Sequence, residues 1–344
     1  MLFEHVRAAG IKRLAIVGIA KHAGKTTALN TIVAEAAEAG IPLSLQSIGV
    51  DGERFDALIK AAKPAVQAVA GTLIATAAEA LEECTARMTL VEATGIPSAM
   101  GEILILRVAE AGNVLLAGVR QVAHAKELNG RFEKWGAQLH IIDGAFDRMA
   151  CASPDLSDGI VLATGASVGR TVESVVRETK AALARLRMPA VTQDWQRQLA
   201  ALARTSGCIW AGGPSVTPRM LPDINLLLHP PDSHPDWPQE AMALALPGVV
   251  TDGVLEMATG VVTTLIVKDG TRMMASPLQW KRFEHQGGRI LAEVPIRIAA
   301  VTVNSVSLSG YRLPQQELLA SIRALAKDLP VVDCKEGAHE QTES

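Results

Sequence analysis

Aromatic residues are scarce in this chain, and positive charge is not in excess. Phe, Trp and Tyr make up 3% of the 344 residues, and the formal net charge is -3. Proteins that bind nucleic acids usually carry a basic patch or stripe, and those that bind single strands also stack bases on aromatic side chains. The composition therefore argues against a nucleic-acid partner.

Cysteines are few, and long uninterrupted apolar segments are missing. The four cysteines lie far apart without a CxxC pair, which argues against a zinc site or a disulfide framework. Reduced thiols in a cytoplasmic protein are the simple interpretation. The N-terminal residues lack the pattern of a secretory signal. The longest apolar stretch, residues 246–267, contains Asp252 and Glu256, so we expect no membrane span.

What the chain has instead is an alternation of strand-like and helix-like patterns. A β-branched run at residues 13–17 leads into a glycine-containing loop, and apolar residues at helical spacing follow it. Strand patterns recur at residues 42–50, 88–93, 139–142 and 159–163, and helix patterns at 121–135 and 172–186. This alternation predicts an α/β fold with a mainly parallel sheet.

The composition shifts near residue 200, where we place a domain boundary. Residues 1–200 are expected to form the first α/β domain, residues 201–334 a smaller second one, and the polar residues 335–344 a disordered tail. Within these domains, two hairpins are expected, at residues 102–118 and 263–276, because turn residues interrupt apolar runs there.

The most specific pattern is GIAKHAGKTT, from Gly18 to Thr27. A phosphate-binding loop needs small residues whose backbone N–H groups converge on phosphates, then a lysine, then a Ser or Thr hydroxyl for magnesium. The start of a helix adds favourable partial charge. The segment supplies these groups in order, and the residues expected to contact a nucleotide are Gly18, Lys21, His22, Ala23, Gly24, Lys25, Thr26 and Thr27.

Within the loop, Lys25 is the expected catalytic lysine, and Thr26 the expected magnesium ligand. Two residues leave alternatives open. Lys21 either neutralises phosphate bound to its own chain or reaches a partner chain. His22 is expected to contribute its backbone N–H rather than its ring.

Carboxylates at the ends of strands are candidates to complete the site. Asp143 follows the strand at 139–142 and is expected to hold magnesium through a water molecule. Asp51 and Glu53 follow the strand at 42–50, where ligands gather in open α/β sheets. Both are expected to be catalytic, and they could form a switch segment with Asp51 near magnesium. Glu92 is a weaker third candidate.

Base recognition leaves little trace in the sequence. No Asn-Lys-x-Asp or Thr-Lys-x-Asp segment is present, which favours ATP over GTP. Residues 163–167 lie where a loop for the base or ribose could be. We therefore expect Mg²⁺ with ATP, or with GTP, as the ligands.

The loop has five residues between Gly18 and Gly24 instead of the usual four, and this spacing resembles dethiobiotin synthetase. That enzyme belongs to a class of P-loop proteins that includes MinD and nitrogenase iron protein. In a MinD-type loop a second lysine lies five residues before the main one, whereas Lys21 lies four before Lys25. A MinD-like loop would be compatible with a homodimer.

Several sequence segments together resemble those of P-loop proteins encoded beside cobalamin-dependent lysine and ornithine aminomutases. They are residues 20–30, 47–53, 161–166, 268–271 and 300–304. The resemblance implies a P-loop ATPase that helps to reactivate the mutase. The alternative is a small-molecule ligase or kinase of the dethiobiotin synthetase type. The chain has no Asp-x-His-x-x-Gly segment, so it is not expected to carry cobalamin itself.

Overall fold

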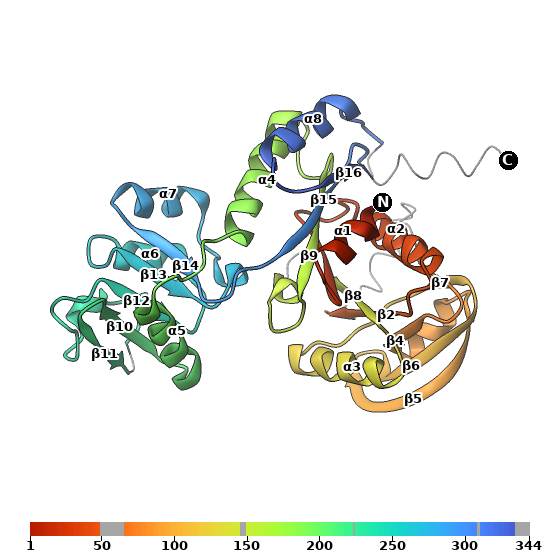
Figure 1. Ribbon diagram of the computed structural model, residues 1–344, viewed down its shortest axis with the longest axis horizontal. Coiled ribbons are helices and arrows are strands. Elements are labelled where there is room, and N and C mark those ends of the chain that lie inside the picture. The colour runs from red at the N-terminus through yellow and green to blue at the C-terminus, as the bar shows by residue number, and fades with distance from the viewer. Residues whose placement is uncertain (49–64, 145–148, 223, 308–309, 334–344) are drawn as a thin grey trace. The chain divides into compact units, whose positions relative to one another are not determined.

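A computed structural model describes residues 1–48, 65–144, 149–222, 224–307 and 310–333 (Figure 1). The chain forms two compact units. Unit 1 consists of Met1–Lys180 together with the chain from Arg297 onward, and unit 2 is Ala181–Ile296. The expected boundary near residue 200 differs from this division, because the chain returns to unit 1 after unit 2. The expected tail at residues 335–344 lies outside the described residues.

The described part of unit 1 contains a nine-stranded sheet in the order β16-β15-β9-β1-β8-β2-β4-β6-β5. Six neighbouring strands from β16 to β2 run parallel, as does the pair β2–β4, while β6 is antiparallel to β4 and β5. The sheet is therefore mostly parallel, as the alternating pattern predicts. Its strands are β1 (Arg13–Gly18), β2 (Leu43–Ile48), β4 (Leu73–Ala77), β5 (Arg87–Ser98), β6 (Gly101–Glu110), β8 (Leu139–Gly144), β9 (Gly159–Gly165), β15 (Ile298–Asn304) and β16 (Val331–Asp333).

Helices cover this sheet because its central strands are apolar on both faces. Every residue of β9, and every residue of β1 after Arg13, is buried. On one face, buried side chains of α1 and α2 join β1, β2 and β8 in a common core. The helices of unit 1 are α1 (Leu2–Ala8), α2 (Lys25–Glu38), η2 (Ala78–Glu83), α3 (Val122–Lys134), η3 (Met149–Ala152), α8 (Gln315–Leu325) and α4 (Val172–Leu186), which begins in unit 1.

The sequence at residues 297–304, 314–327 and 331–334 has a strand–helix–strand pattern, and these elements form in the structure, but the strands join the sheet of unit 1. β15 pairs with β9 in parallel over Ile298–Asn304, and β16 pairs with β15. Residues 297–333 therefore complete the sheet of unit 1 rather than a second domain. The sequence of an apolar parallel strand does not indicate which strand lies next to it in the sheet. The pattern therefore predicts the strands but not their partners.

Unit 2 has its own smaller α/β sheet in the order β11-β10-β12-β13-β14. The strands β12, β13 and β14 are parallel, and β10 is antiparallel to both β11 and β12. Its elements are α5 (Asp194–Ser206), β10 (Ile209–Gly213), β11 (Val216–Leu221), η4 (Pro231–Ser233), β12 (Ala243–Leu246), α6 (Asp252–Ala258), β13 (Thr264–Val267), η5 (Gly270–Arg272), α7 (Pro277–His285) and β14 (Arg289–Ala292).

The period of two along β12 divides the core of unit 2 between the faces of its sheet. Ala243 and Ala245 pack with α5, whereas Leu244 and Leu246 belong to the core that contains Phe283 of α7 and residues of α6. Successive side chains of a strand point to opposite faces, which explains the alternation. The two faces are thus covered by different helices (Figure 1).

Both expected hairpins are wrong. At residues 102–118, β6 pairs with β4 and β5, while β7 (Gly112–Val114) pairs with β3 (Val66–Ala68) in a separate two-stranded sheet. At residues 263–276, β13 pairs in parallel with β12 and β14. There the Asp269 side chain caps η5, so the turn residues end the strand instead of reversing it.

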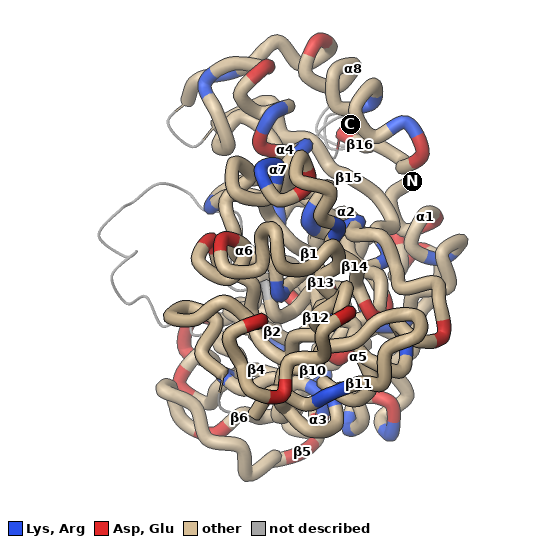
Figure 2. The backbone as a smooth tube through the Cα atoms, turned by 90° about the vertical axis from the view of Figure 1, so that its left-hand side faces the viewer, with Lys and Arg blue, Asp and Glu red and all other residues tan. Residues whose placement is uncertain are grey.

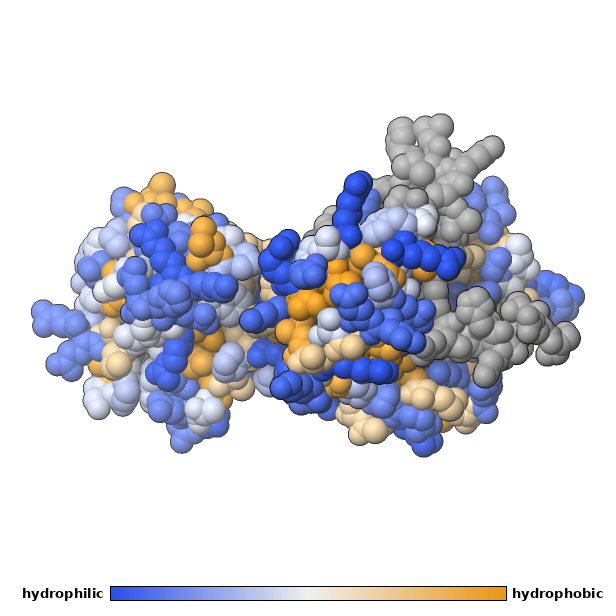
Figure 3. All heavy atoms as spheres, turned by 90° about the horizontal axis from the view of Figure 1, so that it is seen from above, coloured by the Kyte–Doolittle hydropathy of each residue, from blue (hydrophilic) through white to orange (hydrophobic). Residues whose placement is uncertain are grey.

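Charged and apolar residues are mixed over the surface. Figure 2 shows Lys and Arg interspersed with Asp and Glu over the backbone. Figure 3 shows apolar residues as separate areas between hydrophilic ones. Among the helices of the described residues, none combines the length and the apolar character that crossing a bilayer requires.

Candidate functional site

The carboxyl ends of four parallel strands meet beside the loop that follows β1. In the register of the sheet, Gly18 of β1 lies beside Ala163 of β9, and Ile16 lies beside Asp143 of β8. β15 continues the row, with Asn304 beside Gly165. Ligands of open α/β sheets bind in the crevice at such ends, where successive connections leave in opposite directions. Here the chain leaves β1 towards β2 and leaves β8 towards β9, so β1 lies at this reversal.

The loop between β1 and α2 turns through two left-handed residues. The backbone angle φ is 63° at His22 and 99° at Gly24. Glycine is required at the second position because a side chain there would be strained, and its Cβ would lie 3.1 Å from the Cβ of Asn304. The Ser167 hydroxyl donates to the His22 carbonyl at 2.8 Å, which ties the loop to the end of β9. The loop therefore has a defined path, set by neighbouring strands.

Lys25 extends back across the start of the loop. A Cβ added to Gly18 would lie 2.9 Å from Cγ of Lys25, so only glycine leaves space for this side chain. The Nζ of Lys25 then donates to the backbone carbonyl of Gly144 at 2.7 Å. Gly144 is the last residue of β8 and follows Asp143 directly. The structure thus places the ammonium group of Lys25 beside the strand end that carries Asp143.

The charges of this site act on the buried thiol of Cys151 in η3. Burial, the largest cause, and the negative charge of Asp143 together raise the pKa of Cys151 to about 12, although the positive charge of Lys25 opposes the rise. Cys151 is 1% exposed. The thiol therefore stays protonated and acts as a packed apolar group behind the site.

The remaining loop residues differ in exposure. Lys21 and His22 are exposed, Ala23 is buried, and Thr26 and Thr27 are half-buried in the first turn of α2. The hydroxyl of Thr26 and the carboxylate of Asp143 are hard oxygen donors, which magnesium prefers. Among the described residues, no group of three or more His, Cys, Asp or Glu forms a metal cluster, so a metal here would need oxygens from its ligand or from water.

Two expected carboxylates cannot be placed, and a third lies elsewhere. Asp51 and Glu53 fall outside the described residues. Glu92 lies on the edge strand β5, where it pairs with Arg131 at 2.5 Å and accepts from the Trp135 indole at 2.8 Å. Its pKa is lowered by these partners, with the Trp135 hydrogen bond as the largest cause. Glu92 therefore belongs to a surface network and is not brought to the loop.

Asn304 is a site residue to which the sequence pattern assigned no chemistry. It ends β15, and its side chain packs against Gly24 at the start of α2. The side-chain oxygen accepts from the backbone N–H of Val306 at 3.1 Å, so the amide is held in place. Asparagine after a β-branched strand was the available signal, but only the sheet order brings it beside the loop.

An open pocket of about 490 Å³ borders the other side of the loop. Ile19 and Ala20 form one wall, and the opposite wall comes from the β9–α4 connection and the first turns of α4. The hydroxyl of Tyr311 contacts the carbonyls of Ala166 and Gly169 and donates its single hydrogen to one of them at a time, which ties Tyr311 to that connection. The polar side chains lining the pocket are Arg170, Thr171, Ser174, Arg177 and Glu178.

No protein-family profile, curated protein or solved structure gives a significant match.

Proposed function

We propose that this chain binds a magnesium–nucleoside triphosphate at Gly18–Thr27 and hydrolyses it. The position of Lys25 is the observation that carries this proposal. Its side chain crosses the glycine that begins the loop, and its Nζ, 2.7 Å from the Gly144 carbonyl, lies at the edge where the strands end. When a nucleotide binds, the ammonium group of Lys25 can leave the Gly144 carbonyl and donate to phosphate oxygens instead.

The other residues of the loop fit the same ligand. Backbone N–H groups at the start of α2 favour an anion, because the helix begins there with four unsatisfied donors. Magnesium would neutralise charge on the β- and γ-phosphates, and Thr26 and Asp143 are the residues that would hold it. Asn304 is positioned to contact the part of the nucleotide that lies over Gly24.

Calorimetry with ATP and GTP tests the binding step. Lys25→Ala should weaken nucleotide binding by about 100-fold, because it removes hydrogen bonds of a charged donor worth about 3 kcal/mol. Lys12→Ala is the matched control, since Lys12 is an exposed lysine on the same unit. Equal affinity of Lys25→Ala and the wild type would refute the nucleotide site. Asp143→Asn should instead raise the magnesium concentration needed for binding.

For the role of hydrolysis, we propose an accessory ATPase that reactivates a cobalamin-dependent aminomutase. This role rests on the nucleotide site proposed above and on the resemblance of several sequence segments to P-loop proteins encoded beside such mutases. ATP and ADP states must then differ in their affinity for the client, because a ligand bound equally by both states shifts nothing. A mutase inactivated by turnover should recover when the protein, fresh adenosylcobalamin and ATP are added. Recovery no faster than with the cofactor alone would exclude this role.

A small-molecule kinase or ligase is the second candidate, and the pocket beside Ile19 and Ala20 favours it. A substrate bound there would lie next to the loop proposed to hold phosphates, and Arg170 and Arg177 could bind an acidic substrate. The two candidates differ in what stimulates hydrolysis. A small acid or amine that accelerates ADP release in the purified protein supports the kinase or ligase, whereas a requirement for a protein supports the accessory ATPase.

A further inference from the structure

A second pocket lies in unit 2, at the carboxyl ends of its three parallel strands. It has a volume of about 260 Å³. Its walls include Leu246 and Pro247 at the end of β12, Val267 and Lys268 at the end of β13, and Glu293 just after β14. Ligand sites of α/β sheets favour this end of the strands. The volume is just below the range of pockets for drug-sized ligands, so a smaller molecule is indicated.

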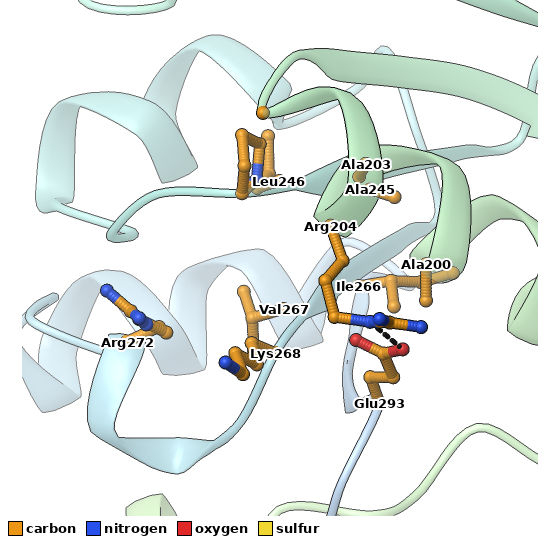
Figure 4. Close-up of a pocket in the computed structure, with 12 residues that line it drawn as sticks. Ala200, Ala203, Arg204, Ala245, Leu246, Ile266, Val267, Lys268, Arg272 and Glu293 are labelled. Carbon is orange, nitrogen blue, oxygen red and sulfur yellow. Dashed lines mark hydrogen bonds and ion pairs between the residues drawn. The ribbon is translucent and has the colours of Figure 1, made fainter. Parts of the chain in front are cut away.

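One part of the pocket wall is apolar and is set by close packing. Small side chains of α5 face the sheet there, and Ala200 and Ala203 are both buried. Figure 4 shows α5 passing over the strands with these alanines turned towards Ala245 and Ile266. These residues pack on one another in a single core, so the helix and the sheet close the pocket on this side with an apolar wall.

The charged residues of the pocket are mainly cationic. Among the described residues that line it, Arg204, Lys268 and Arg272 stand with one carboxylate, that of Glu293, which gives these four side chains a formal charge of +2 (three positive charges and one negative). Nearby Asp269, which is fully buried, is engaged by the backbone N–H and the hydroxyl of Thr271. Even with Asp269 counted, positive charge is in excess.

The carboxylate of Glu293 is already paired. The Nε of Arg204 donates to Glu293 at 2.9 Å, and the Glu293 side chain is only 15% exposed (Figure 4). On the other side of the pocket, the Nε of Arg272 is buried and has no hydrogen-bond partner within the described part of the chain. A buried donor of this kind costs free energy unless it is satisfied.

We propose that this pocket of unit 2 binds a small molecule with a short apolar body and a terminal oxyanion, either a carboxylate or a phosphate. Lys268 and Arg272 would hold the oxyanion, since lysine and arginine make charge-assisted hydrogen bonds to both groups. The apolar body would lie against Leu246 and Pro247 at the end of β12. Neither a metal ion nor an organic cation suits a lining with excess positive charge. This site is independent of the proposed nucleotide loop.

Calorimetric titration of the full chain with two probes, pentanoate and butyl phosphate, tests the proposal. At least one of them should bind saturably, and the tighter of the two identifies the oxyanion. Butylamine has a similar body with the opposite charge and should not bind. Butyl phosphate is also titrated into Lys25→Ala, so that any contact with the loop of unit 1 is removed while the pocket of unit 2 is unchanged.

Variants of the pocket make the test specific. Lys268→Gln should weaken binding of the probe by about tenfold or more, whereas Lys281→Gln, on the exposed surface of α7, should not change it. Glu293→Gln should tighten binding, because it removes the opposing carboxylate and releases Arg204. If Lys268→Gln fails to fold, this tighter binding of the probe by Glu293→Gln still tests the proposal. Absence of saturable binding by both anions, or equal affinities of Lys268→Gln and Lys281→Gln, would overturn the proposal.

Discussion

At the scale of single residues, Lys25 and Asn304 show what the sequence could and could not predict. The Gly-Lys-Thr pattern after a strand predicts where Lys25 lies, because its place depends only on the loop and the helix that follow β1. Asn304 lies about 280 residues further along and reaches the loop only because β15 lies next to β9 in the sheet. Long-range order of parallel strands leaves no local pattern, so this contact could not be predicted.

Cys151 gives a prediction at the same scale. With a pKa of about 12, it should be ionised in about one molecule in ten thousand at pH 8. Its 1% exposure further blocks a reagent. Iodoacetamide at this pH should therefore modify the half-buried Cys208 of the native protein and leave Cys151 unmodified until denaturant is added. Peptide mapping by mass spectrometry distinguishes the two sites. Early labelling of Cys151 would contradict its packed position behind the loop.

At the scale of elements, β1 is fixed at both ends. Its carboxyl end leads into the loop, and its amino end is held by Asp158, which immediately precedes β9. The carboxylate of Asp158 accepts from the Arg13 side chain at 2.6 and 3.0 Å, and from the backbone N–H groups of Arg13 and Lys12 at 2.8 and 3.2 Å. This cluster sets the register of the strand that positions the proposed phosphate loop.

Asp158→Asn should lower the free energy of unfolding at pH 7 by about 1–2 kcal/mol, because the variant keeps the shape but loses charge-assisted hydrogen bonds. Burial alone would raise the pKa of Asp158, but the hydrogen bonds and charge of Arg13 outweigh it, so the folded-state pKa is lowered from 3.8. The stabilisation is thus present above 3.8 and is lost as the pH falls through the folded-state value. The difference between variant and wild type should shrink accordingly.

Urea unfolding at neutral and acidic pH, with hydrogen exchange of the β1 peptide, measures this effect. Asp194→Asn is the matched control, since Asp194 also pairs with an arginine, Arg197 at 2.5 Å, but its side chain is 99% exposed. An exposed pair contributes little, so the control should change stability by less than about 0.5 kcal/mol. Similar losses in both variants would mean that Asp158 does not anchor β1.

The elements also show why the hairpin predicted at residues 263–276 does not form. The Lys268-Asp-Gly270 segment has the composition of a hairpin turn, yet Asp269 uses its carboxylate to cap η5. The following chain then forms α7 and returns in parallel as β14. Turn residues mark where a strand ends, whereas the direction of the next strand depends on what packs over the sheet. Helices α3 and α4, whose apolar spacing is regular, were predicted to within a few residues.

At the scale of the whole molecule, the sheet of unit 1 is built from two distant parts of the chain. β15 borders β9 along six paired positions and buries Ala299, Ala300, Val301 and Val303 to 5% exposure or less. Burial of such side chains contributes about 1–3 kcal/mol each for the larger ones, and α8 adds further apolar contacts. The sum is comparable to the net stability of a typical domain, about 5–15 kcal/mol. Unit 1 should therefore depend on the chain that follows unit 2.

Truncation tests this dependence, because the two ways of dividing the chain give opposite outcomes. If residues 1–200 were a complete domain, a chain ending at Ile296 would keep unit 1 folded. The strand order instead predicts that unit 1 does not fold in this truncated chain. Without β15, the strand β9 would become an exposed edge along seven residues that are otherwise buried. Unit 2 should survive in the same fragment, because both of its cores lie within residues 188–292. A chain ending at Asp333, after β16, is the control and should keep both units.

Limited proteolysis followed by mass spectrometry reports on each unit separately. If peptides of β1 and β9 stay protected in the chain that ends at Ile296, the contribution of β15 to the fold is small, and the proposed loop is supported without it. If they are cleaved while those of β12 and β13 stay protected, the last strands of the chain are what hold the proposed site together.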